Sequence, residues 1–396
     1  MCAKLNRRQG TGVKLSFSDP RLRALVYQAA AIATALFVAW YLISNTLANL
    51  EARRIASGLG FLGREAGFAI GETTFIAYSA ADTYFRALAV GVANTFRVAL
   101  IGIVAATVLG TMIGLARLSH NWLLAKLAAG YVEFIRNVPL LVQLFLWYVL
   151  ITENLPLPRQ ALEPLPGVYL TNRGVFFPVP AAHPAYAWMF AAFLGGVAAA
   201  LLFAWWAARR QALSGRRPPV LEIVLALVLV APALAYFIAG APTELDVPRL
   251  VGFNFTGGVA LTPEFTALTL GLVIYTAAFI AEIVRAGIVA IQYGQFEASY
   301  ALGLRRGLAM RLVVLPQALR VIVPPMTSQY LNLTKNSSLA VAIGYPDLVS
   351  IANTTMNQTG QAVEGIAIIM AVYLTISLSI SAFMNWYNAR IALKER

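Results

Sequence analysis

One apolar segment of the sequence carries polar side chains at helical spacing. In the run MTSQYLNLTKNSSLAVAIG, Ser328, Asn332 and Lys335 recur every three to four residues, with Gln329 and Asn336 beside them. Charged and amide side chains are costly inside an apolar helix, so this face is expected to meet protein or a water-filled path. Such a polar face suggests a path for a polar solute through the membrane. An equal alternative is that Lys335 reaches the membrane surface or pairs with a carboxylate of a partner subunit.

Two pairs of opposite charge form a second group of candidates. Glu133 and Arg136 in YVEFIRN, and Glu282 and Arg285 in FIAEIVRAG, are each spaced i, i+3, which puts both members of a pair on one helix face. Such pairs could belong to an inner gate or anchor a loop at the inner surface. Simple neutralisation at the membrane interface is the favoured alternative, because such pairs are common and weak when wet.

Prolines and glycines within the apolar runs predict breaks and close contacts. Pro139 and Pro232 should each kink or break a helix. Gln143, four residues after Pro139, is a further candidate for facing the substrate, although prolines are tolerated in membrane spans without any such role. Gly110 and Gly114 form a small-xxx-small pair, which predicts close helix packing.

The chain lacks the motifs of covalent, nucleotide and metal chemistry. None of its five lysines precedes Ser or Thr, so no Walker A phosphate-binding loop is present. Serine-hydrolase and zinc-protease motifs are also missing. Two histidines exclude a multi-histidine metal site, and the single cysteine, Cys2, excludes an internal disulfide. We therefore expect no enzyme activity and no cofactor or metal in this chain.

The composition places these residues in a membrane. Of the 396 residues, 59% are hydrophobic and only 12% are charged, and long apolar runs recur along the chain. The sequence predicts an all-α integral membrane protein. Its eight expected spans are residues 24–47, 88–116, 127–151, 185–207, 220–240, 265–288, 322–344 and 365–387.

The distribution of basic residues orients the spans. With the N-terminus inside, the inner segments hold 20 Lys and Arg residues and the outer segments hold 7, which favours both termini in the cytoplasm. This topology explains the net charge of +13 better than nucleic-acid binding does. We expect a cytoplasmic tail over 1–23, the first span and an outer loop over 24–87, and one transmembrane domain over 88–390. Extra spans and structured outer loops occupy 152–264 of that domain.

A polar inner segment, QFEASYALGLRRGLAMRLVVLPQALRVIVPP, joins spans six and seven. A short helix is expected from Gln295 to Leu302, with Glu297 in its first turn and Gly303 ending it in a left-handed conformation. A second helix should run from Arg305 to about residue 315 and stop at Pro316. Without further information, the segment could equally be an amphipathic helix resting on lipid.

The same segment resembles the EAA loop of ABC-importer permeases. EASYALG followed by LPQALR matches that pattern, with Ser299 in place of the second alanine. The stretches NTFRVALIGIVAATVLGTMIGLARLS and YVEFIRNVPLLVQLFLWY resemble the upstream part of these permeases. PQALR followed by IVPP and TKNSSLA resembles the polar amino acid family. The extra spans, the long outer loops and the stretches FNFTGG, SQYLNLTKNSSLA and NQTGQ resemble the Q-type permease subunit of general L-amino-acid import systems. Asn336 and Ser337 replace the Asp and Thr usual after the lysine.

The resemblance implies a fold, partners and a role for the loop. It implies the type I ABC-importer permease fold, with the first loop helix acting as a coupling helix in a groove of a separate ATPase dimer that binds ATP and magnesium. Glu297 and Gly303 would set the helix shape, Ala298 and Ala301 would keep it slim, and Arg305 would lie beside it in the coupling loop over 291–320. Further implied partners are a homologous second permease in a heterodimer, a periplasmic amino-acid-binding protein, an amino acid substrate and inner-membrane lipid.

An ion-coupled secondary transporter is the main alternative function. Such carriers usually place titratable carboxylates near the middle of the membrane. No Asp lies in any expected span, and the glutamates lie toward the ends of the spans: Glu133 and Glu282 inside, Glu264 and Glu364 outside. The sequence therefore favours the ATP-driven permease.

Overall fold

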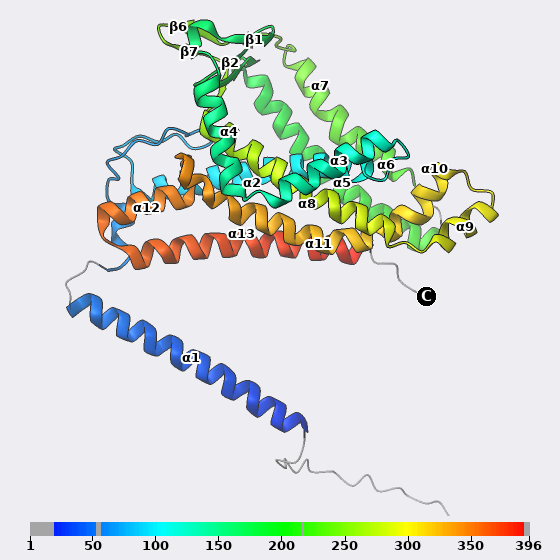
Figure 1. Cartoon of the computed structure of the whole chain (residues 1–396), viewed down its shortest axis with the longest axis horizontal. Coiled ribbons are helices and arrows are strands. Elements are labelled where there is room, and N and C mark those ends of the chain that lie inside the picture. The colour runs from blue at the N-terminus through cyan, green and yellow to red at the C-terminus, as the bar shows by residue number, and fades with distance from the viewer. Residues whose placement is uncertain (1–19, 53–56, 216–217, 392–396) are drawn as a thin grey trace, which may run out of the picture.

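The computed structural model describes residues 20–52, 57–215 and 218–391. The first helix, α1 (Pro20–Ala52), begins a few residues before the expected span. It lies apart from the other helices and is inclined to them (Figure 1). Most of the expected cytoplasmic tail lies outside the described residues.

Four helices form the bundle on which the other elements are built. They lie side by side in Figure 1, and within the bundle the first two, α2 and α8, pack most closely. Their bounds are Tyr84–Ala116 (α2), Pro263–Val289 (α8), Leu315–Asn336 (α11) and Ala362–Ile391 (α13). We call the end where α8 begins the outer end and the end where it finishes the inner end, following the charge distribution.

Small residues explain how closely α2 approaches α8. A Cβ atom added to Gly110 would lie 2.7 Å from Cβ of Ile280, and one added to Gly114 would lie 2.7 Å from the carbonyl oxygen of Ala281. The predicted close packing through this pair is confirmed.

The described residues contain seven helices that are long and apolar enough to cross a membrane, and up to eight if one bent pair is counted as a span. This agrees with the expected number. The bent pair comprises α3 (Trp122–Asn137) and α4 (Leu140–Asn154), whose axes differ by 105°. The expected span over 127–151 is thus divided into two helices at a sharp bend, and the expected break at Pro139 is confirmed. The residue before a proline disfavours helical backbone, and Val138 is extended.

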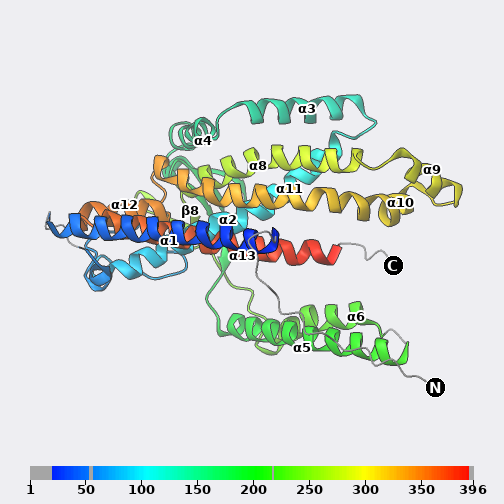
Figure 2. The same ribbon diagram turned by 90° about the horizontal axis from the view of Figure 1, so that it is seen from below.

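The extra spans form a helical hairpin that stands apart from the bundle (Figure 2). It comprises α5 (Pro184–Ser214), α6 (Val220–Leu225), a π-helical turn η3 (Ala226–Val230) and α7 (Ala231–Ile238). The π turn ends two residues before Pro232, and its wider hydrogen-bond spacing accommodates the N–H that proline lacks.

The outer segments, predicted from the sequence only as structured loops, contain short strands. A four-stranded antiparallel sheet has the order β1-β2-β3-β8, and β4-β5 and β6-β7 form two ribbons. Tyr169 stacks on Phe255 with ring centroids 4.5 Å apart. The bounds are Leu162–Leu165 (β1), Val168–Thr171 (β2), Gly174–Phe177 (β3), Val179–Pro180 (β4), Leu245–Asp246 (β5), Arg249–Val251 (β6), Asn254–Thr256 (β7) and Val259–Leu261 (β8).

The remaining outer elements are short helices. They are the 3₁₀ turns Leu59–Gly63 (η1), Pro158–Gln160 (η2) and Ser337–Ile343 (η5), and the helix Leu348–Thr359 (α12).

The polar inner segment forms two short helices beyond the inner end of the bundle (Figure 2). The first, α9 (Tyr293–Ala301), begins two residues earlier than expected, so Glu297 lies in its second turn and the predicted position in the first turn is wrong. The second, α10 (Arg306–Ala309), continues through a π turn, η4 (Met310–Val314), into α11. The expected stop at Pro316 is also wrong, because the preceding π turn lets the helix run through that proline.

Candidate functional site

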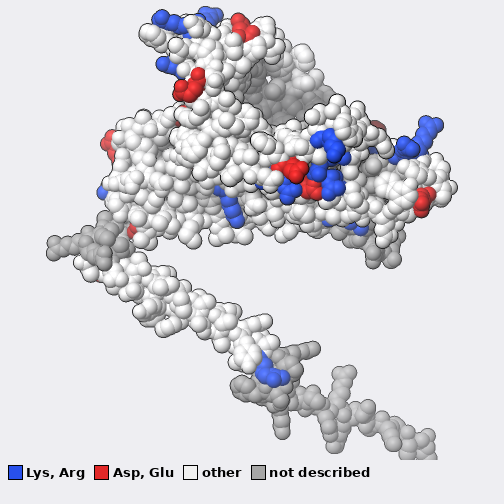
Figure 3. Space-filling model, in the orientation of Figure 1, with Lys and Arg blue, Asp and Glu red and all other residues white. Residues whose placement is uncertain are grey.

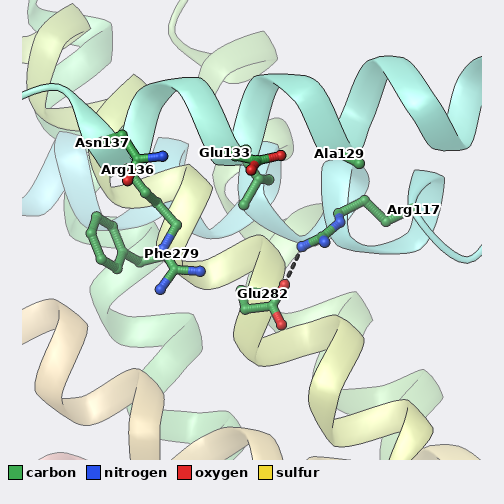
Figure 4. A pocket seen from close by; sticks show the side chains of 8 residues that line it. Arg117, Ala129, Glu133, Arg136, Asn137, Phe279 and Glu282 are labelled. Carbon is green, nitrogen blue, oxygen red and sulfur yellow. Dashed lines mark hydrogen bonds and ion pairs between the residues drawn. The ribbon is translucent and has the colours of Figure 1, made fainter.

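A cleft of about 460 Å³ opens toward the inner half of the bundle, between α3, α8 and the end of α2. Figure 3 shows charges of both signs gathered at one place on this flank, which is otherwise almost uncharged. The side chains lining the cleft come from three helices (Figure 4): Arg117, Ala129, Val132, Glu133, Arg136, Asn137, Phe279 and Glu282.

Glu282 is the centre of an ion-paired group in this cleft. Arg285 donates from Nη2 to Glu282 Oε1 at 2.6 Å and from Nε to Oε2 at 3.2 Å. Arg117 Nη1, from the end of α2, donates to the same Oε2. The predicted i, i+3 pair is thus confirmed, and the structure adds a cross-helix partner. The spacing of residues along the chain does not show which helix Arg117 faces, so this partner of Glu282 was not predicted.

Glu133 and Arg136 behave differently from that pair. No hydrogen bond or ion pair joins them within the described residues, so the predicted pair is not formed. The Arg136 guanidinium lies over the ring of Phe279, with Cζ 5.0 Å from the ring centroid. Both charged side chains are exposed in this chain. Figure 4 shows Arg136 reaching from α3 toward Phe279 on α8, whereas the Glu133 side chain stays close to α3.

The polar stripe on α11 faces away from the bundle core. Ser328, Asn332 and Lys335 are exposed, whereas the intervening Leu333 and Thr334 are fully buried. Gln329 and Asn336 are half-buried at the edges of the stripe. Because this chain leaves the stripe uncovered, the stripe must meet water or another subunit rather than the bundle.

Gln143 does not reach that stripe. Its side chain is 4% exposed, and its Nε2 donates to the carbonyl oxygens of Ile135 and Val138, both at 3.0 Å. These carbonyls are left without helical partners by the break at Pro139, so Gln143 caps the end of α3. Its expected place on the substrate path is therefore not what the structure shows.

The predicted coupling residues are brought together on the inner end. Glu297, Ala298, Ala301, Gly303 and Arg305 are all exposed. Backbone N–H groups of the turn close the end of α9, from Gly303 to the carbonyl oxygen of Tyr300 at 2.9 Å and from Leu304 to that of Ser299 at 3.1 Å.

The turn after α9 requires glycine and displays an apolar side chain. Gly303 has φ 75°, in the left-handed region that glycine adopts without strain. Next to it, Leu302 is 80% exposed at the tip of the segment.

Metal chemistry has no visible basis in this part of the chain. Within residues 20–52, 57–215 and 218–391, no group of three or more His, Cys, Asp and Glu side chains could hold a metal ion.

Comparison with known proteins agrees with this architecture. Residues 200–393 match the family model described as binding-protein-dependent transport system inner membrane component. The permease protein YhdX of Escherichia coli is 49% identical over 99% of this chain and 100% of its own length. The general L-amino acid transport system permease protein AapQ of Rhizobium johnstonii is 46% identical over 98% and 97%. The glutamate/glutamine/aspartate/asparagine transport system permease protein BztB of Rhodobacter capsulatus is 43% identical over 98% of each chain. The chain therefore belongs to the family of amino-acid ABC transporter permeases.

Proposed function

We propose that this chain is the translocation subunit of an ATP-driven importer that carries a broad range of L-amino acids across the bacterial inner membrane. Similarity over nearly the whole length to a general L-amino acid permease supports this range of substrates. The amino acid would arrive from a periplasmic binding protein at the outer end and leave at the inner end. The observation that carries the proposal is the exposed α9 segment in a chain that lacks any phosphate-binding loop.

The α9 segment fits a docking role better than a lipid-resting role. A helix that rests on lipid buries one apolar face, but α9 exposes Glu297 together with small residues, Ala298 and Ala301, on its surface. A short helix beyond the bundle, with small residues on its surface, can insert into a groove of an ATPase dimer. ATP and magnesium would be bound by that dimer, and this chain would do no covalent chemistry.

The α11 stripe supports a path formed with a second subunit. A stripe bearing Ser328, Asn332 and Lys335 is too polar for lipid and remains uncovered by this chain. A homologous permease facing it would enclose a water-filled route, with the two chains forming a heterodimer. Gln329 and Asn336 would border the route. In this arrangement Lys335 attracts the carboxylate that every amino acid carries.

The coupling turn offers the sharpest test of this function. Proline fixes φ near −65°, so Gly303→Pro cannot adopt the conformation that ends α9. We expect this variant to lose ATP-driven uptake of L-glutamine in proteoliposomes containing the whole complex, and to co-purify with less ATPase. Gly307→Ala is the matched control, because Gly307 lies in α10 with open space around it. We expect it to transport normally.

Two results would count against the proposal. Normal ATP-driven uptake by Gly303→Pro would show that α9 merely rests on lipid. Uptake by the purified chain alone, driven by an ion gradient and independent of ATP, would establish a secondary transporter instead.

A further inference from the structure

The inner cleft contains one pair of opposite charges that the protein itself does not neutralise. Both oxygens of Glu282 accept hydrogen bonds, from Arg285 and Arg117, so this carboxylate is satisfied. The two remaining charged groups that line the cleft, Glu133 and Arg136, have no ion-pair partner within the described residues. Among residues 20–52, 57–215 and 218–391, the cleft lining therefore offers one carboxylate and one guanidinium without an ion-pair partner, both on α3.

The position of Arg136 leaves its hydrogen-bonding edge available. The guanidinium lies over the ring of Phe279, with Cζ 5.0 Å from the ring centroid. A contact of a cation with a ring face uses none of the guanidinium N–H groups as hydrogen-bond donors to a protein oxygen. The N–H groups of a guanidinium form a planar fork that is suited to bidentate binding of a carboxylate.

The position of Glu133 complements that of Arg136. The two residues are one helical turn apart on the same face of α3, and Arg136 is held over Phe279 instead of turning back to Glu133. Glu133 can therefore accept hydrogen bonds from an ammonium group placed beside Arg136. Asn137, next along the same lining, offers a neutral amide to either group.

We propose that this cleft binds the zwitterionic head of an amino acid, with the α-carboxylate on Arg136 and the α-ammonium on Glu133. The proposal rests on the amino acid transport proposed above and adds a site to it. The head group is common to all amino acids, and a cleft of about 460 Å³ leaves room for side chains of different size. Recognition of the head alone accounts for how one inner site accepts many substrates.

Binding from the cytoplasmic side tests this site without the periplasmic binding protein. The whole complex, purified through this chain and kept free of nucleotide, is dialysed against tritiated L-glutamine. We expect L-glutamate and L-leucine to compete, because they share the head group. L-Glutaminamide lacks the carboxylate and N-acetyl-L-glutamine lacks the ammonium, so we expect neither to compete.

Two substitutions test whether Arg136 and Glu133 bind the amino acid. Arg136→Gln and Glu133→Gln should each weaken L-glutamine binding about tenfold or more, since each removes a charge-assisted hydrogen bond. Arg136→Lys keeps the charge but loses the planar fork, and should give an intermediate affinity. Arg159→Gln is the control: Arg159 lies over Phe253 in the outer segment, with Cζ 4.4 Å from the ring centroid, and the cleft lies in the inner half of the bundle. Its binding should match that of the unchanged chain.

The outcomes separate this proposal from the proposed transport function. Unaltered binding in both the Arg136→Gln and Glu133→Gln complexes, shown intact by gel filtration, would overturn the site. So would competition by L-glutaminamide, or displacement of L-glutamine by phosphatidylethanolamine, whose head group is also zwitterionic. Absence of ATP-driven uptake by the unchanged complex would instead contradict the transport function.

Discussion

The outer and inner halves of the molecule each hold an arginine–glutamate ion pair, but in opposite surroundings. At the outer end, Arg97 and Glu72 have side chains 7% and 6% exposed, with Nη1 and Oε2 3.0 Å apart. Thr262 donates to the other oxygen of Glu72 at 2.6 Å. The ring of Phe265 covers the guanidinium, 4.0 Å from Cζ to the centroid. At the inner end, Glu282 and Arg285 are 28% and 33% exposed.

The difference separates a closed ion pair from an open group of charges. In the outer pair every charge is matched, and water is excluded, so the pair joins the segment 57–83 to α2 and to the start of α8. In the inner group, the charges of Glu133 and Arg136 are exposed and have no ion-pair partner in the part of the chain that the structure describes. A buried pair is costly to break, whereas exposed charges cost little to rearrange and remain free to bind a ligand.

Breaking the outer pair should have the largest effect on stability. Arg97→Leu leaves Glu72 buried without a counter-ion, which costs about 3–5 kcal/mol. We expect a strongly reduced yield of folded complex and a lower thermal unfolding temperature. The measurement is unfolding of the purified complex followed by intrinsic fluorescence. Arg86→Gln is the matched control, because the Arg86 side chain is 47% exposed in its pair with Asp82, and its unfolding temperature should hardly change. Equal effects of the two substitutions would remove the distinction between closed and open pairs.

A pH dependence should also arise at the closed outer end. Burial raises the pKa of the Asp347 carboxyl to about 6, partly offset by hydrogen bonds from the Ser350 N–H at 2.9 Å and the Tyr373 hydroxyl at 3.4 Å. The folded state then holds this proton more tightly than the unfolded state. Stability should therefore fall by about 3 kcal/mol as pH rises from about 4 to about 6, and stay lower above that range.

Replacing Asp347 sharpens this prediction. Asp347→Asn keeps a good N-cap for α12 and removes the titration. We expect the unfolding temperature of this variant to vary less between pH 4 and pH 6 than that of the unchanged chain. An identical pH profile for the two would show that Asp347 does not titrate in this range.

The smallest effect is expected at the inner group. Arg117→Gln removes one of the two partners of Glu282, but Arg285 still pairs with both oxygens. With the Arg117 side chain 19% exposed, the loss should be about 1 kcal/mol or less. The measurement is the thermal unfolding temperature of the Arg117→Gln complex, compared with that of the Arg97→Leu complex. A loss as large as that of Arg97→Leu would mean that the inner group is as closed as the outer pair.

Patterns along single helices were predictable from the sequence, and contacts between helices were not. The i, i+3 spacing of Glu282 and Arg285 correctly placed them together, because both lie on one helix. The same spacing failed for Glu133 and Arg136, because Phe279 on another helix holds the arginine. The prediction for Gln143 failed for a similar reason. The break at Pro139 was predictable, but the 105° angle between α3 and α4 decides which carbonyl groups Gln143 can reach.

The sequence by itself determined the apolar helices, their number, the orientation suggested by basic residues, the glycine turn at Gly303 and the polar stripe ending at Lys335. These follow from local periodicity, backbone preference and the cost of charge in an apolar medium. Only the tertiary structure decided that Arg97 meets Glu72, that Arg117 joins Glu282, and that Glu133 and Arg136 line a shared cleft without pairing to each other. Such contacts depend on the rotation and depth of whole helices, which side-chain spacing along one chain segment does not specify.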